Sequence, residues 1–254
     1  MLRGLVLLKQ KEDLQWLEFE LLSEIPGLIQ GVFLRNGGVS QPPFGTLNVT
    51  ERFGDVAEAV KENHKRISRA LGVPSLFYGN QVHGCELALV KALEKRTPSC
   101  DGLVTGQPGL PLMVMHADCQ AAIFYDPLHK ALAVVHAGWR GLVQNIYKAT
   151  LQKMGRDFGT LPKDTLVCIA PSLGPNHSEF IHYKKEFPPS FWAFKNETHH
   201  FNLWEIARDQ LKQCGILSHH IQIAEICTYS NPEHYFSYRR DKVTGRNATV
   251  ASLL

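Results

Sequence analysis

Short apolar stretches, many of them alternating or rich in β-branched residues, recur along the chain and predict strands. Turn residues such as Asp126-Pro127 bound these stretches, and several are apolar at nearly every position, which is typical of strands in a well-buried sheet. Strands are therefore predicted at residues 14–22, 31–34, 76–90, 110–125, 130–136, 166–170 and 221–228.

Helical spacing of apolar residues appears in three other segments. Asp55 followed by Glu58 resembles a capping box, and Gly72 comes directly after the last periodic apolar residue. A second apolar stripe follows His136, and Asn202 begins a third. Helices are predicted at residues 55–72, 139–155 and 202–215. This mixture of strands and helices indicates an α+β or layered α/β fold.

Length and composition favour one ordered domain spanning residues 1–254. The chain has 254 residues, of which 44% are hydrophobic and 20% charged, and it has no repeat, linker or low-complexity tract. Its formal net charge is only +3, with scattered basic residues, which argues against a nucleic-acid partner.

The sequence predicts a cytoplasmic protein that does not enter a membrane. Lys9 and Lys11 interrupt the apolar run at residues 5–8 before it reaches signal-peptide length, and no later run could span a bilayer. The six cysteines are widely spread without a Cys-x-x-Cys pair, so we expect reduced thiols.

Three predicted strands carry a potential metal ligand within them or at their ends: His83, Cys119 and His136. Imidazole and thiolate are good zinc ligands, and two histidines with one cysteine leave a fourth position open, as catalytic zinc sites do. A lone histidine at a strand end is more often a packing residue, and a lone buried cysteine is usually inert. A nucleophilic Cys119 activated by His136 is the rival hypothesis.

Eight blocks of sequence together resemble the laccase-domain family, formerly called multicopper polyphenol oxidases and now regarded as purine nucleoside phosphorylases. The resemblance runs from about residue 30 to the C-terminus, in the family's order. The blocks are Arg35-Asn36-Gly37-Gly38-Val39-Ser40, Leu47-Asn48, Gly54-Asp55, Gln81-Val82-His83-Gly84, Asp101-Gly102-Leu103-Val104-Thr105, Ala117-Asp118-Cys119, His136-Ala137-Gly138-Trp139-Arg140-Gly141 and Phe236-Ser237-Tyr238-Arg239-Arg240.

The resemblance implies that His83, Cys119 and His136 bind zinc, the same residues that the chemistry of the side chains selects. It also implies an α+β fold with layered mixed β-sheets and flanking helices, similar to the cytotoxic necrotizing factor catalytic domain. The implied reactions are phosphorolysis of adenosine, inosine, guanosine and methylthioadenosine, and deamination of adenosine. His116 and Gln120 flank the cysteine where the family more often has Thr and Leu.

The partners expected on this basis are purine nucleosides and phosphate, and the protein is expected to be a monomer or a small homo-oligomer. Catalytic roles are predicted for Cys119, His136 and Arg140. Arg140 is included because it stands where a strand gives way to a helix and could face an anion there. Guanidinium and amide groups suit phosphate, ribose and base. The candidate substrate-binding residues are Arg35, Asn36, Asn48, Arg239 and Arg240.

Asp118 adjoins the cysteine, but neighbours on a regular strand point to opposite faces, so we expect it to support the site from behind. His116 should likewise face away and is not predicted as a ligand.

Three alternative functions differ in what they require of the sequence. A copper-dependent phenol oxidase requires His-x-His pairs, and none of the 12 histidines is two residues from another. A metal-free cysteine hydrolase would use Cys119 and His136. A non-catalytic interaction protein has no specific support in the sequence.

Overall fold

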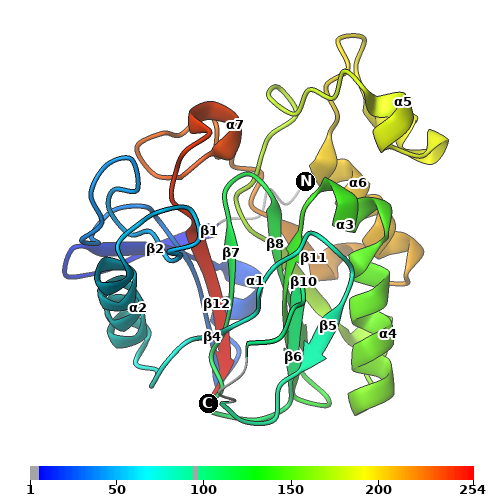
Figure 1. Ribbon diagram of the computed structural model, residues 1–254. Coiled ribbons are helices and arrows are strands. Elements are labelled where there is room, and N and C mark those ends of the chain that lie inside the picture. Colours follow the sequence, from blue (N-terminus) through cyan, green and yellow to red (C-terminus); the bar gives the residue numbers. More distant parts are fainter. Residues whose placement is uncertain (1–5, 94–96) are drawn as a thin grey trace.

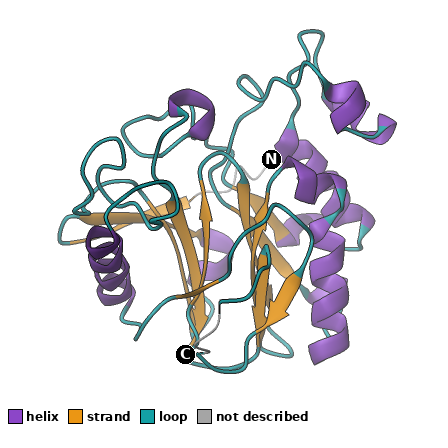
Figure 2. Ribbon diagram, viewed as in Figure 1, coloured by secondary structure: helices purple, strands orange, loops and turns teal. Residues whose placement is uncertain are grey.

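The computed structural model describes residues 6–93 and 97–254. It contains two mixed β-sheets with helices on their outer faces (Figures 1 and 2). The first sheet has the order β1-β2-β3-β12-β7-β4, and the second has the order β11-β10-β8-β9-β6-β5. The α+β prediction with layered sheets and flanking helices is confirmed.

The strands of the first sheet are β1 (Val6–Lys11), β2 (Leu14–Phe19), β3 (Leu28–Phe33), β4 (Phe77–Tyr78), β7 (Leu112–His116) and β12 (Asn247–Leu253). Those of the second are β5 (Leu87–Leu89), β6 (Gly102–Thr105), β8 (Gln120–Asp126), β9 (Ala131–Ala137), β10 (Leu166–Ile169) and β11 (Ile221–Ile223). The α-helices are α1 (Glu20–Ser23), α2 (Ala57–Leu71), α3 (Trp139–Val143), α4 (Ile146–Phe158), α5 (Tyr183–Glu186), α6 (Leu203–Gln213) and α7 (Tyr238–Asp241). Single 3-10 turns lie at Pro162–Asp164, Pro189–Phe194 and Ser218–His220.

Alternation along the central strands builds a core between the sheets and one on the outside of each. Val134 of β9 packs between the sheets while its neighbour Val135 packs against helices. On β7, Val114 faces the other sheet and Met113 faces α2. The helix α2 covers the first sheet, whereas α4 and α6 cover the second (Figure 1). The order of layers is therefore helix, sheet, sheet, helix.

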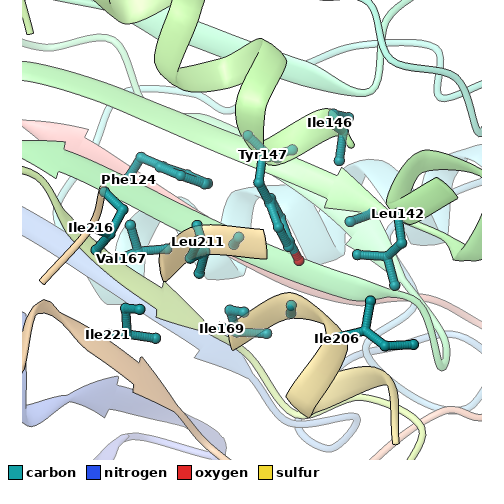
Figure 3. Packing of buried hydrophobic residues seen from close by; sticks show 14 of the residues in the cluster. Phe124, Leu142, Ile146, Tyr147, Val167, Ile169, Ile206, Leu211, Ile216 and Ile221 are labelled. Atoms are coloured by element: carbon teal, nitrogen blue, oxygen red, sulfur yellow. The ribbon is translucent and has the colours of Figure 1, made fainter. Parts of the chain in front are cut away.

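The core under α4 and α6 is an apolar cluster that also encloses the hydroxyl of Tyr147 (Figure 3). Tyr147 of α4 lies against Phe124, and its hydroxyl donates a hydrogen bond of 2.6 Å to Oε1 of Gln120. The amide of Gln120 in turn donates to the carbonyl of Leu203. This chain of contacts ties the beginning of β8 to both covering helices.

Three predicted elements have different boundaries. Residues 76–90 form no single strand, because the chain leaves the first sheet after β4 and joins the second at β5. Residues 110–125 likewise divide into β7 and β8, which lie in different sheets. The predicted helix 139–155 is interrupted at Asn145, which has a left-handed backbone and caps α4. The helix α4 then continues to Phe158, with Gly159 as its C-cap, beyond the predicted end at Gly155.

Other boundaries agree more closely. The helix α2 ends at Gly72 as predicted, but Asp55 does not form the capping box, because its carboxylate accepts from Val56 and Asn48. Asn202 caps α6 by accepting from the backbone N–H of Glu205. Of the predicted strand 221–228, only β11 forms a strand. The strands β1, β6 and β12 were not predicted. In the described residues no helix is long and apolar enough to cross a membrane.

Tyr147→Phe tests the polar contact in the core. Loss of the hydroxyl leaves Oε1 of Gln120 buried without a donor, so we expect the free energy of unfolding to fall by about 1–3 kcal/mol. Tyr125→Phe is the matched control, because the Tyr125 hydroxyl forms no hydrogen bond with the described residues. Denaturant unfolding of both variants measures the difference, and equal stabilities would contradict the role given to Tyr147.

Candidate metal centre

The three predicted metal ligands meet at one end of the two sheets. His83 lies in the connection from β4 to β5, Cys119 lies in the connection from β7 to β8, and His136 lies near the end of β9. Because β4 and β7 are parallel neighbours, their C-terminal ends lie together, and both connections then cross to the second sheet. Ala121 of β8 pairs with His136 of β9, which brings the third ligand beside the second.

The ligand atoms of His83, Cys119 and His136 all lie within 4.8 Å of one another. Sγ of Cys119 is 3.9 Å from Nε2 of His83, and the two imidazole rings meet edge to face with centroids 4.8 Å apart. Tetrahedral zinc with ordinary Zn–S and Zn–N bonds holds its ligand atoms roughly 3.3–3.7 Å apart. The residues present therefore fit a tetrahedral ion after small side-chain movements.

A single buried carboxylate, that of Asp101, holds two of the ligands. Its Oδ1 accepts hydrogen bonds of 2.9 Å from the backbone N–H of His83 and from Nδ1 of His136. Its Oδ2 accepts from the backbone N–H groups of Val82 and Gly84 at 3.2 and 2.7 Å. Since Nδ1 of His136 donates to Asp101, Nε2 is the nitrogen that remains for a metal.

The hydrogen bonds to Asp101 also explain the charge of its carboxylate and the backbone conformation of His83. Burial raises the pKa of Asp101, but the hydrogen bonds from His136, Gly84 and Val82 outweigh it and hold the pKa below its ordinary value. The same amides allow the backbone of His83 to keep a φ of 60°, which is rare outside glycine.

Gly138 is required by the close approach of the ligands. A Cβ atom at this position would lie 2.8 Å from Cδ2 of His83 and 3.3 Å from Sγ of Cys119. Neither contact can be relieved without moving a ligand. The glycine two residues after His136 is thus part of the ligand geometry.

Cys119 and His136 shift each other's pKa. Burial raises the pKa of Cys119, but the charge and hydrogen bond of His136, together with those of His83, lower it to about 6. Burial lowers the pKa of His136, whereas Cys119 and Asp101 raise it to about 9. Cys119 is therefore poised as a thiolate, the form that both metal binding and nucleophilic attack require.

Two cavities meet at the ligand group. The larger has a volume of about 740 Å³, the smaller has about 560 Å³, and His83, Cys119 and Tyr238 line both. The larger is also lined by His136, Tyr78, Gln81, Phe53, Arg52 and Arg246. The smaller is also lined by Trp139, Arg140, Phe180, Arg239 and Lys242. A metal at this position would be accessible from either side.

Arg140 and Arg239, predicted from sequence, lie beside the smaller cavity. The guanidinium of Arg140 stacks 4.4 Å from the Trp139 ring centroid and forms no ion pair with the described residues. That of Arg239 donates through Nη1 to the carbonyls of His177 and Glu179. Both positions are compatible with a ligand contact from this side.

The other predicted substrate-binding arginines hold loops in place. The guanidinium of Arg35 donates to the carbonyls of Gly45 and Pro232, and it lies 4.5 Å from the Phe236 ring centroid. That of Arg240 donates to three carbonyls in residues 228–235 and to Asp241. Neither residue lines one of the two cavities, and a direct contact with substrate stays a prediction.

The two predicted asparagines are also engaged by the protein. Asn48 is fully buried, where it donates to the Thr50 carbonyl and the Asp55 carboxylate and accepts from the backbone N–H of Arg246. Asn36 donates to the carbonyl of Glu233. Asn48 thus positions an arginine of the larger cavity, although it does not line that cavity itself.

Asp118 and His116 are not part of the group of potential ligand atoms, although Asp118 lines the smaller cavity and His116 lines the larger one. Asp118 has a φ of 88° at the crossover, and its carboxylate accepts from the hydroxyls of Thr228 and Ser237 and from the backbone N–H of Arg239. It therefore anchors the segment that carries α7. Nε2 of His116 lies 2.9 Å from the Thr249 hydroxyl.

Sequence reasoning gave no role to Asp101, Gly138, Arg52 or Arg246. The glycine two residues after a potential ligand was a visible signal, whereas the strand that follows Asp101, β6, was itself not predicted. For Arg52 and Arg246, nothing in their spacing from the ligands indicated that the chain brings them to the same cavity.

The fold and site together define a class of α+β protein in which a His-Cys-His group lies between two cavities at the end of a pair of mixed sheets. Residues 29–254 match the family model described as multi-copper polyphenol oxidoreductase laccase, and the chain belongs to this family.

Relatives and solved structures agree with this assignment. A "Purine nucleoside phosphorylase" of Bacteroides thetaiotaomicron is 32% identical over 90% of this chain and 92% of its own length. The "Purine nucleoside phosphorylase YfiH" of Escherichia coli is 31% identical over 87% and 91%. The crystal structure of YlmD from Geobacillus stearothermophilus superposes with a TM-score of 0.87 at 27% identity, covering 98% of this chain and 99% of that one.

Asp101→Asn tests the carboxylate clamp. An amide offers one oxygen in place of two and cannot accept from all four donors, so we expect metal affinity to fall about 10- to 100-fold. Competition with a chelator of known affinity measures the change. Asp126→Asn is the matched control, since Asp126 is also buried and accepts from Nδ1 of a histidine and from backbone amides, at the far end of β8. Equal metal affinity in the two variants would contradict the clamp.

Proposed function

We propose that this chain is a purine nucleoside phosphorylase with a zinc centre held by His83, Cys119 and His136. The observation that supports it most is the placement of these three ligand atoms, within 4.8 Å of one another, at the wall of a cavity of about 740 Å³. A cavity of this volume suits a small ligand such as a nucleoside. The names of the relatives supply the reaction class.

The proposed substrates are adenosine, inosine, guanosine and methylthioadenosine, with phosphate as the second substrate. An oxygen of phosphate forms a bond to C1′ of the sugar while the bond from C1′ to the purine nitrogen breaks. The electron pair of that bond goes to the purine, which leaves after taking up a proton. The products are a sugar 1-phosphate and the free base.

A second proposed reaction is deamination of adenosine, in which water adds to C6 of the purine and ammonia leaves, giving inosine. When bound, zinc supplies a Lewis acid at the position that three protein ligands leave open. The protein holds that position steady, because Asp101 orients His136 and the backbone of His83. Arg140 lines the smaller cavity, and we propose that its guanidinium contacts the substrate from that side.

One alternative has an observation of its own. The pKa of Cys119, at about 6, and that of His136, at about 9, suit a thiolate–imidazolium pair, as a metal-free cysteine hydrolase would use. Copper in the same three-ligand site is a further alternative for the metal. Within the described residues, however, His83, Cys119 and His136 are the one group able to hold an ion, which disfavours multicopper chemistry.

Metal analysis of purified protein and of Cys119→Ala separates these proposals. We expect about one tightly bound zinc per chain in the wild type and a large loss of both zinc and activity in the variant. Thermal stability should fall only moderately, because the three hydrophobic cores remain. Cys214→Ala, which removes a half-buried thiol outside the ligand group, should keep its zinc. An active wild type without metal would favour the cysteine hydrolase, and bound copper would reopen the oxidase.

Product analysis with adenosine tests the reaction. We expect release of adenine that depends on phosphate and formation of inosine that does not, and both should disappear in His83→Ala, which removes one of the three residues that would hold the metal. Chromatography of the products with and without phosphate gives the two rates. Base release that ignores phosphate would indicate a nucleoside hydrolase, and no base release at all would exclude the phosphorylase.

A further inference from the structure

Two arginines that no sequence argument selected line the larger cavity, and both lie near one aromatic ring, that of Phe53. The guanidinium carbon of Arg246 is 4.0 Å from the centroid of the Phe53 ring, and that of Arg52 is 6.0 Å from the same centroid. Both arginines line the cavity that His83, Cys119 and His136 also line. The cavity thus combines the ligand group with a pair of cations.

The protein fixes one edge of each guanidinium and leaves the rest free. Nη1 of Arg52 donates to the Gln81 carbonyl at 2.9 Å and to the Asn80 side chain at 3.3 Å. Nη1 of Arg246 donates to the carbonyls of Thr244 and Gly245 at 2.8 and 3.0 Å. Nε and Nη2 of both side chains form no hydrogen bond with any described residue.

The positive charge of this pair is not balanced by a contacting carboxylate. Within the described residues no acidic group lies within 4.0 Å of either guanidinium, so no ion pair occupies their donors. Burial lowers the pKa of Arg246, the charges of Cys119, Asp118 and Tyr238 raise it, and the nearby positive charge of Arg52 lowers it by a smaller effect than these. An anion bound between the two arginines would relieve that repulsion.

We infer that Arg52 and Arg246 bind phosphate in the larger cavity, through the guanidinium edges that face away from their backbone acceptors. The inference rests on the proposed phosphorylase function and assigns its second substrate to a cavity. Planar guanidinium groups match the oxygens of phosphate, and two of them can neutralise a dianion. The phosphate then shares its cavity with His136, on the opposite side of the ligand group from Arg140.

The alternative position for phosphate is the smaller cavity, beside Arg140 and Arg239. Three carboxylates, those of Asp118, Glu179 and Glu186, also line that cavity and offset the charges of Arg140, Arg239 and Lys242, which makes it less favourable for a dianion. In the larger cavity Glu51 is the acidic residue among the lining side chains. The charge balance therefore favours the Arg52–Arg246 side.

The test compares phosphate dependence in Arg52→Gln, Arg246→Gln and Arg140→Ala, using the metal-loaded protein. We expect the KM for phosphate to rise about 10- to 100-fold in the first two variants, with a smaller change in the KM for nucleoside. Arg140→Ala should raise the KM for phosphate less than either. Arg69→Gln, an exposed arginine of α2, is the matched control for loss of one guanidinium.

Arg246 is half-buried, so Arg246→Gln could fail to fold, and Arg52→Gln on the exposed loop then decides the test. An unchanged KM for phosphate in Arg52→Gln, or a rise confined to Arg140→Ala, would overturn the inference while leaving the phosphorylase intact.

Calorimetric titration with inorganic phosphate separates this inference from the reaction. If the wild type releases no base, the proposed function fails, but weaker phosphate binding in Arg52→Gln than in Arg69→Gln still supports the site. Equal binding by these two variants, or no binding by the wild type, would overturn it.

Discussion

The carboxylate of Asp101 is the contact on which the geometry of the candidate metal centre depends. It lies directly before β6, beside the end of β9, and it accepts from the backbone on both sides of His83 and from the ring of His136. The backbone of His136 also donates to the Asp101 carbonyl at 2.7 Å. A loop with an unfavourable φ at its ligand is thus held against a strand by one buried charge, which limits the freedom of the ligands before any ion binds.

The arrangement of the two sheets explains why ligands so far apart in sequence come together. The chain leaves the first sheet after β4 and again after β7, and each time it enters the second sheet at the same end. Each crossover has a residue with positive φ at its ligand or directly before it. In the first crossover this residue is His83 itself, and in the second it is Asp118, which precedes Cys119. Loop residues placed by rigid strands are where binding and catalytic groups usually occur. The two cavities lie at the same end, since residues of both crossovers line them.

Local signals in the sequence identified the helix ends that carry a characteristic residue. They missed the boundaries that only tertiary contacts define. Gly72 and Asn202 mark helix ends through backbone conformation and a side-chain cap, which are local properties. The break between β7 and β8 is not local, because apolar residues continue on both sides of it and only the change of sheet reveals it. The strand β12 was missed since its buried residues include Asn247, Thr249 and Ser252, which carry no hydrophobic periodicity, yet it pairs with β3 and β7 in the middle of the first sheet.

In the candidate site, the sequence likewise indicated the potential metal ligands but not which arginines are free to contact a substrate. His83, Cys119 and His136 could be selected because few side chains bind zinc, so residue type alone was informative. Arginine is different, since it serves loops and ligands with the same donors. The guanidinium of Arg35 is occupied by carbonyls that close a loop, whereas that of Arg246 keeps donors free beside a cavity. Whether an arginine can receive a substrate thus depends on which of its donors the fold has already used, and only the folded chain determines that.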